Sequence, residues 1–139
     1  MMRKVRILIM TFAILMSTMA YSQTRKEVEK WQHVMDAIIQ VESEGNPKAK
    51  SKDCVGVLQI RSILVRDVNE YLKIKKISKR FSLNDRFNVN KSKEMFILYQ
   101  ERYNPTNNVE KAIRLWNGGC RYSVSKTEKY YRKVLAHMK

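Results

Sequence analysis

Residues 31–45 have the sequence WQHVMDAIIQVESEG, in which the apolar positions follow the period of an α-helix. The side chains that share this apolar face are Trp31, Val34, Met35, Ile38 and Val41. Gly45 and Pro47 are typical of the end of such a helix. Glu42 follows Ile38 by four residues and Met35 by seven, so it falls on the apolar face. The pattern therefore predicts a carboxylate on the buried side of the last turn.

A carboxylate at that position has unusual chemistry. Desolvation and the negative end of the helix dipole both disfavour its ionised form, so both raise the pKa of Glu42. A carboxyl group that stays protonated near neutral pH is suited to act as a general acid. The alternative is a frayed helix end from which the Glu42 side chain turns into solvent.

The four glycines of the chain fall in two places. Gly45 and Gly56 follow Glu42, and Gly118 and Gly119 follow Trp116 and Asn117. Glycine permits positive φ and a close approach of the backbone, so the two places together suggest one cleft lined by two loops. Ordinary helix C-caps are the alternative for Gly45 and Gly118.

The remaining signals are mostly helical. The capping box at residues 24–27 predicts the start of the first helix, and a second capping box at residues 125–128 predicts the start of the last one. Further helices are expected over residues 62–72, after Asn88 and from residues 107–110, whereas residues 55–60 favour a strand or an extended segment. Residues 73–87 are basic and give no clear prediction. The predicted fold is a single small, mainly helical domain with one short β element.

The N-terminus has the pattern of an export signal. Arg3, Lys4 and Arg6 precede an apolar run over residues 7–20, and residues 20–22 form a small-x-small cleavage site. The run is too short for a comfortable membrane span. We therefore predict a signal peptide at residues 1–22, a domain at residues 23–139 and no stable membrane anchor after cleavage. The predicted location is the periplasm or the exterior of a bacterial cell.

The charge indicates an anionic partner. The formal charge of +15 falls to +12 without residues 1–22, which hold three basic residues and no acid. Nucleic acid, acidic lipid surfaces and bacterial cell wall all fit this excess, but export and the acids present on every helix argue against nucleic acid. The densest basic run, residues 73–80, is interpreted as a solvated loop.

Cys54 and Cys120 are the two cysteines of the chain. An even number of cysteines in an exported protein invites a disulfide, and two inert thiols are the alternative. No metal site and no cofactor are expected, since His33 and His137 lie far from both cysteines in the sequence.

Several motifs together resemble the SLT-type lytic transglycosylases of the lysozyme-like superfamily. In that family a helix ends in Glu-Ser, as at Glu42-Ser43, and a Ser-x-x-Gly-Ala-x-Gly-Leu-Met-Gln segment follows. Ser51, Gly56, Leu58 and Gln59 match that segment, and residues 88–89 match an Asn-Ile pair. Residues 115–119 resemble the Tyr-Asn-Ala-Gly motif, and residues 127–134 resemble the closing Thr-x-x-Tyr-x-x-x-Val helix. The resemblance covers about residues 30–135 and implies a lysozyme-like α+β fold.

The sequence departs from this family pattern at several positions. Cys54 stands where the first glycine of the segment is usual, Val57 where Leu is usual, and Leu58 where Met is usual. Trp116 replaces a tyrosine whose hydroxyl supports the catalytic acid, so Trp116 is expected either to stack on a sugar or to belong to the core. The resemblance also implies that the segments next to Cys54 and Cys120 face each other, which favours the disulfide.

The activity implied by the resemblance is cleavage of the β-1,4 bond between N-acetylmuramic acid and N-acetylglucosamine in peptidoglycan. Glu42 would be the catalytic acid and base, and the substrate-binding residues would be Ser43, Gln59, Trp116, Asn117 and Tyr130. A secretion, conjugation or phage machine is the expected partner.

Two alternatives remain open at this point. One is a lysozyme-like hydrolase that uses Glu44, Asp53 or Asp85 as a second carboxylate. The other is an inactive cell-wall-binding module.

Overall fold

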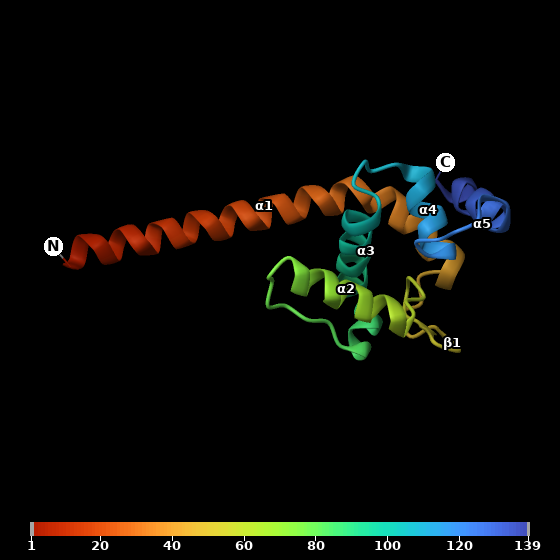
Figure 1. The fold of residues 1–139 in the computed structure, drawn as a ribbon, viewed down its shortest axis with the longest axis horizontal. Helices are drawn as coiled ribbons and strands as arrows, with labels where there is room; N and C mark the ends of the chain where they lie inside the picture. Colours follow the sequence, from red (N-terminus) through yellow and green to blue (C-terminus); the bar gives the residue numbers. More distant parts are fainter. Residues whose placement is uncertain (1, 139) are drawn as a thin grey trace. The chain divides into compact units, whose positions relative to one another are not determined.

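The computed structural model describes residues 2–138, apart from the side chains of residues 2–5, 20, 21 and 24. The elements are α1 (Met2–Ser43), β1 (Lys50–Ser51), β2 (Cys54–Val55), α2 (Ser62–Ile74), the 3₁₀ helix η1 (Leu83–Phe87), α3 (Val89–Tyr103), α4 (Val109–Gly118) and α5 (Val124–His137). Figure 1 shows their course. The predicted fold class, mainly helical with a short β element, is confirmed. The chain divides into two compact units, residues 1–30 and 31–139.

The first unit consists of the N-terminal part of α1. Its large apolar side chains between Ile7 and Met19 are exposed. Among the described residues, no helix combines the length and the hydropathy that crossing a membrane requires. The predicted helix start at Thr24 is wrong, because α1 runs through this position without a break. The signal peptide at residues 1–22 stays a prediction.

The core of the second unit forms around the last turns of α1. Trp31, Val34, Met35 and Ile38 are almost completely buried, as the helical pattern predicts. Trp31 packs edge-on against Phe96 of α3, with 5.9 Å between the ring centroids. Two further pairs of helices pack together, α2 with α3 and α4 with α5 (Figure 1).

The β element differs from the prediction. Lys50 and Ser51 pair with Val55 and Cys54 in a two-stranded antiparallel hairpin, whereas the predicted strand was residues 55–60. Residues 56–59 form a turn, closed by a hydrogen bond from the Gln59 N–H to the Gly56 carbonyl at 3.1 Å. Gly56 has φ +80° and Gln59 has φ +50°. These left-handed conformations end the extended backbone despite the β-branched residues nearby.

Arg86 of η1 holds this turn in place. Its guanidinium donates hydrogen bonds to the carbonyls of Asp53 at 2.8 Å and Ile60 at 3.1 Å, although the side chain is buried. The Arg86 carbonyl lies so close to Gly56 that a Cβ at that position would meet its oxygen at 1.9 Å. The turn and η1 therefore fit together only with glycine at position 56.

The helix starts after Asn88 and Asn108 are confirmed. The side chain of each accepts a hydrogen bond from the backbone N–H three residues later, at 2.9 Å and 2.8 Å. The start predicted for α5 is two residues late, because Ser123 is the N-cap and accepts from the Lys126 N–H. Both serines have the chemistry of a cap, so composition alone does not separate them.

Candidate active site

Glu42 lies in the last turn of α1, half-buried, as its position on the apolar face predicts. Its Oε1 accepts a hydrogen bond of 2.7 Å from the hydroxyl of Tyr130 on α5. Burial raises the pKa of Glu42 above its usual value of 4.5, and the Tyr130 hydrogen bond opposes this rise only in part. The site thus holds a carboxyl group that keeps its proton to higher pH than an exposed glutamate.

Tyr130 donates this hydrogen bond as a neutral phenol. Burial and the neighbouring Glu42 charge both raise the pKa of Tyr130, so it does not ionise in the range where Glu42 titrates. The sequence predicts Tyr130 as a substrate-binding residue. In the structure its hydroxyl contacts the predicted catalytic acid directly, and its role in substrate binding stays a prediction.

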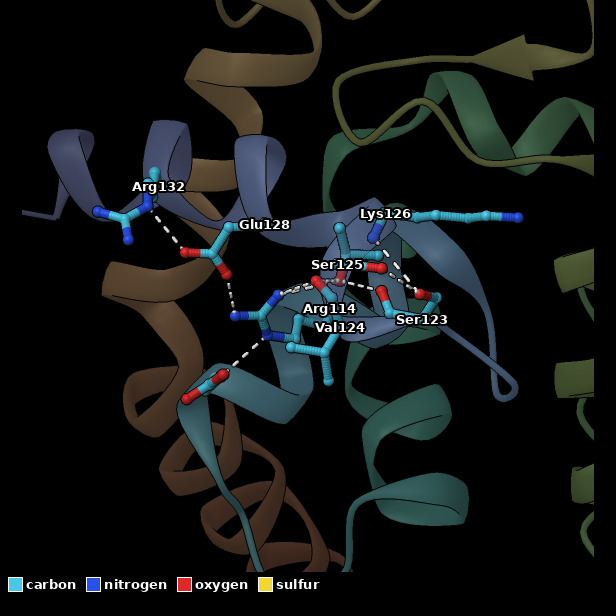
Figure 2. A network of polar contacts seen from close by, with 9 residues as sticks. Arg114, Ser123, Val124, Ser125, Lys126, Glu128 and Arg132 are labelled. Carbon is cyan, nitrogen blue, oxygen red and sulfur yellow. Dashed lines mark hydrogen bonds and ion pairs between the residues drawn. The ribbon is translucent and has the colours of Figure 1, made fainter.

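The position of α5, and hence of Tyr130, depends on a polar network around Arg114 of α4 (Figure 2). The buried Arg114 guanidinium donates to Glu128 at 2.6 Å and to the Val124 carbonyl at 2.8 Å. Glu128 in turn accepts from Arg132 at 2.7 Å, one helical turn further along α5. The guanidinium also stacks over the ring of Tyr131, 4.4 Å from its centroid. These contacts attach the first two turns of α5 to α4.

Ser43 connects the end of α1 to the turn after β2. Its hydroxyl donates to the Val57 carbonyl at 2.7 Å and accepts from the Gly45 N–H at 3.2 Å. Both of these partners belong to the backbone. They fix the turn beside Glu42.

Gln59 also has backbone partners. Its side-chain amide donates to the carbonyls of Gly56 at 2.9 Å and Ala49 at 3.2 Å. The amide therefore braces the turn from inside, while the residue also lines the neighbouring pocket.

Trp116 has one of the two roles considered for it, that of a core residue, and sugar stacking stays a prediction. Its indole N–H donates to the Leu58 carbonyl at 3.0 Å, and its ring lies 4.9 Å from that of Phe96, so it is part of the core. It is only half-buried, however, and its remaining surface faces a pocket. Asn117 lies beside it, exposed, and its side chain makes no hydrogen bond to any of the described residues.

The pocket next to Trp116 has a volume of about 260 Å³. Gln59, Trp116 and Asn117 all line it, so the structure brings these three predicted residues together. Glu42, Ser43 and Tyr130 do not line it. The residues from Val57 to Gln59 connect the two groups, since Ser43 binds the Val57 carbonyl and Trp116 binds the Leu58 carbonyl.

A family model for the transglycosylase SLT domain matches residues 17–133 of the chain. The chain belongs to this family. The match confirms the lysozyme-like, mainly helical fold and the resemblance found in the motifs. No curated protein and no solved structure matched the chain.

Two of the three other carboxylates considered for this SLT domain, Asp53 and Asp85, have structural partners. Asp53 accepts from the backbone N–H and the hydroxyl of Ser62 at 2.8 Å and 2.7 Å, and these hydrogen bonds lower its pKa. Asp85 accepts from Lys91 and from the Ser82 N–H, both at 2.8 Å, and its pKa is lowered as well. Glu44 is exposed. The structure thus raises the pKa of Glu42 and lowers the pKa of Asp53 and of Asp85.

The predicted disulfide is not formed, because Cys54 and Cys120 are both free thiols in the structure. Cys54 lies in the β hairpin next to Asp53, whose carbonyl accepts a hydrogen bond from Arg86 of η1. Cys120 lines the pocket next to Trp116 and is close enough to Tyr99 to influence its ionisation. The two loops therefore present their cysteines to different surroundings. Among the described residues, no group of His, Cys, Asp or Glu could hold a metal ion.

Tyr99 of α3 lines the same pocket, and the sequence did not identify it as a site residue. Its spacing from Ser92 and Phe96 marks it as a core position, and it is 6% exposed. The pattern of apolar positions does not reveal that this residue also lines a pocket.

Proposed function

We propose that this SLT domain is a peptidoglycan lytic transglycosylase in which Glu42 acts first as general acid and then as general base. The observation that supports the proposal is the half-buried Glu42 carboxyl, held at 2.7 Å by the Tyr130 hydroxyl and with a raised pKa. The substrate would be the β-1,4 bond between N-acetylmuramic acid and N-acetylglucosamine.

In the first step, protonated Glu42 gives its proton to the glycosidic oxygen. The bond from this oxygen to C1 of the muramic residue breaks, and the electron pair leaves with the N-acetylglucosamine hydroxyl. Positive charge develops at C1, where the substrate's own N-acetyl oxygen can share it. Burial favours this step because it keeps Glu42 protonated.

In the second step, ionised Glu42 takes the proton of the C6 hydroxyl of the same muramic residue. The C6 oxygen bonds to C1, and a 1,6-anhydro ring closes. Glu42 returns to its protonated form, and no water is consumed. The Tyr130 hydrogen bond supports the first step and not this one, because it stabilises the carboxylate that forms when Glu42 gives up its proton.

This sequence of steps needs one protein carboxylate. A hydrolase with two carboxylates would need a second one with a free face towards the sugar. Asp53 and Asp85 are engaged by Ser62 and by Lys91 with Ser82. Their partners argue against these two as the second carboxylate, which leaves the exposed Glu44 as the remaining candidate for a hydrolase.

The proposal extends to location and partners. Peptidoglycan lies outside the cytoplasmic membrane, so the chain would be exported, with residues 1–22 as the cleaved signal. The excess of basic residues would attract it to the anionic wall polymer. A secretion, conjugation or phage machine remains the partner that we propose, by analogy with other small family members.

The test is digestion of purified peptidoglycan with the full chain, followed by mass spectrometry of the products. We expect anhydro-muropeptides, each one water lighter than the product of hydrolysis. Glu42→Gln, which keeps an acceptor for Tyr130, should lower the rate at least about 100-fold. Reducing-end products would instead establish a hydrolase, and no release by a folded chain would refute the enzymatic proposal.

A further inference from the structure

The 73–80 segment, which begins in the last turn of α2, carries exposed apolar side chains among basic ones. Ile74 is 63% exposed and Ile77 is 39% exposed, while five of the eight residues are Lys or Arg. The interpretation of this run as a solvated loop accounts for the basic residues but not for the two isoleucines, which lie only three positions apart. Aliphatic side chains next to lysines are typical of a surface that contacts a lipid interface.

The backbone of the 73–80 segment is fixed at both ends. At the end of α2, the Ile77 N–H donates to the Leu72 carbonyl at 2.9 Å, and Lys76 has φ +58°. This hydrogen bond and the left-handed residue before it belong to the Schellman motif that ends many helices. At the other end, the side-chain amide of Asn69 pairs with the backbone N–H and carbonyl of Phe81, both at 2.8 Å. The segment is therefore preformed, so docking on a surface costs little conformational freedom.

The lysines of the segment form two groups. Lys75 and Lys79 form ion pairs with acidic residues of α3. Lys73 and Lys76 are exposed and form no ion pair with any other residue that the structure describes. Each of these two directly precedes one of the isoleucines. Uncompensated positive charge thus adjoins exposed apolar surface, and a lipid interface with anionic headgroups is complementary to both.

The position of the segment leaves the candidate active site accessible. The segment lies at the end of α2 that points away from β1 (Figure 1). The turn beside Glu42 precedes the other end of this helix, which begins at Ser62. A helix of this length spans roughly 20 Å. A surface that contacts the 73–80 segment would therefore leave the turn beside Glu42 uncovered.

We propose that the 73–80 segment docks the chain reversibly on a membrane surface that contains anionic phospholipid. Lys73 and Lys76 would contact the lipid phosphates. Ile74 and Ile77 would enter the boundary between the headgroups and the acyl chains. The proposal goes beyond the cleavage of peptidoglycan and does not depend on it.

The test must report on this segment alone, because the apolar run over residues 7–20 can bind lipid by itself. The full chain carries Cys54→Ser, Cys120→Ser and Ser78→Cys, so its single thiol lies next to Ile77 and takes an environment-sensitive nitrobenzoxadiazole label. Vesicles of phosphatidylglycerol and phosphatidylcholine, or of phosphatidylcholine alone, are added while the emission of the label is followed. We expect the emission to rise and move to shorter wavelength with the anionic vesicles only.

Two pairs of lysine substitutions separate docking from general electrostatic attraction. Lys73→Gln with Lys76→Gln should raise the lipid concentration at half-maximal emission change about 30-fold, at about 5-fold for each lysine. Lys126→Gln with Lys129→Gln is the matched control on α5. Both of these lysines are exposed and also form no ion pair within the described part of the chain, so this variant loses the same charge. It should change the lipid concentration much less.

A second pair of variants tests the insertion of apolar side chains. Ile74→Ser changes the more exposed isoleucine of the segment, so the fold should be retained. The lipid concentration at half-maximal change should rise at least about 5-fold. Ile63→Ser is the matched control, because Ile63 is 53% exposed and lies at the start of the same helix. This variant should bind as the parent chain does.

Several results would overturn the proposal. One is an unchanged emission when the chain sediments with anionic vesicles, and another is an equal response to phosphatidylcholine alone. Equal weakening by the two lysine pairs would show that only total charge matters. A response to purified cell-wall fragments and not to vesicles would assign the segment to the wall polymer instead. Because no measurement here uses turnover, a failure of the transglycosylase proposal would leave these results unaffected.

Discussion

Replacing Tyr130 with Phe removes one hydroxyl from the chain and leaves the aromatic ring on α5. That hydroxyl lies 2.7 Å from Glu42 Oε1, a length typical of a hydrogen bond to a charged carboxylate. A hydrogen bond to a charged group contributes about 1.5–3 kcal/mol. If the transition state of the proposed acid step gains all of it, kcat/KM should fall about 10- to 150-fold in the variant, at one factor of ten for about 1.36 kcal/mol.

The pH dependence gives a second and independent readout. The Tyr130 hydrogen bond lowers the pKa of Glu42 against the effect of burial. Without it burial acts unopposed, so the pKa of Glu42 rises further. The proton remains on the acid to higher pH, and the pH–rate profile should move towards alkaline pH in Tyr130→Phe.

The assay is the initial rate of anhydro-muropeptide release, measured from about pH 4 to about pH 9 to cover both limbs of the profile. Tyr131→Phe is the control on the neighbouring residue, where the ring stacks on Arg114. A rate within about twofold of wild type with an unmoved profile would refute the role of this hydrogen bond. A profile that moves towards acid pH would refute the electrostatic reasoning, even if the rate falls.

Three further predictions concern stability, each measured by urea unfolding. Gly56→Ala should lower the free energy of unfolding by about 3 kcal/mol or more, because of the positive φ and the clash with the Arg86 carbonyl. Gly45 also has φ +80°, but a Cβ there would meet open space, so Gly45→Ala should lower it by only about 1–2 kcal/mol. At pH 7 the Glu42→Gln variant should have a higher free energy of unfolding than wild type, because the raised pKa of Glu42 destabilises the folded state once this carboxyl ionises in the unfolded chain. The difference should disappear below pH 4.5, where Glu42 is protonated in both states. Equal stability at pH 7 would contradict this reasoning. Trp116→Phe should destabilise by about 1–3 kcal/mol, since the Leu58 carbonyl loses its donor, and an unchanged midpoint would show that this bond is dispensable.

The helices of the second unit could be predicted because their causes are local. The buried face from Trp31 to Ile38 repeats with the helical period. The caps at Asn88 and Asn108 are hydrogen bonds between residues three apart. Glu42 was identified as a site candidate by the same periodicity, because a carboxylate on an apolar face conflicts with its surroundings.

The predictions that failed depend on contacts that local patterns do not contain. The β-branched residues from Val55 to Ile60 favour a strand, but the turn at Gly56 is shaped by the carbonyl of Arg86, 30 residues further along the chain. A helix cap at Thr24 would contribute only about 1 kcal/mol to the stability of a helix that starts there. Helix-forming residues on both sides let α1 continue through this position.

The contact between Tyr130 and Glu42 joins residues 88 positions apart, which explains why the role of Tyr130 was not predicted. The sequence pointed to position 116 for the hydroxyl that supports the acid, and a tryptophan stands there. In the structure the hydroxyl that contacts Glu42 comes from Tyr130 on α5, while the Trp116 indole donates to the Leu58 carbonyl of the turn. The contact with Glu42 and the bracing of the loop are thus divided between two aromatic residues. A tyrosine at position 116 would leave the Leu58 carbonyl without its indole donor, so the tryptophan suits the way this chain divides the two tasks.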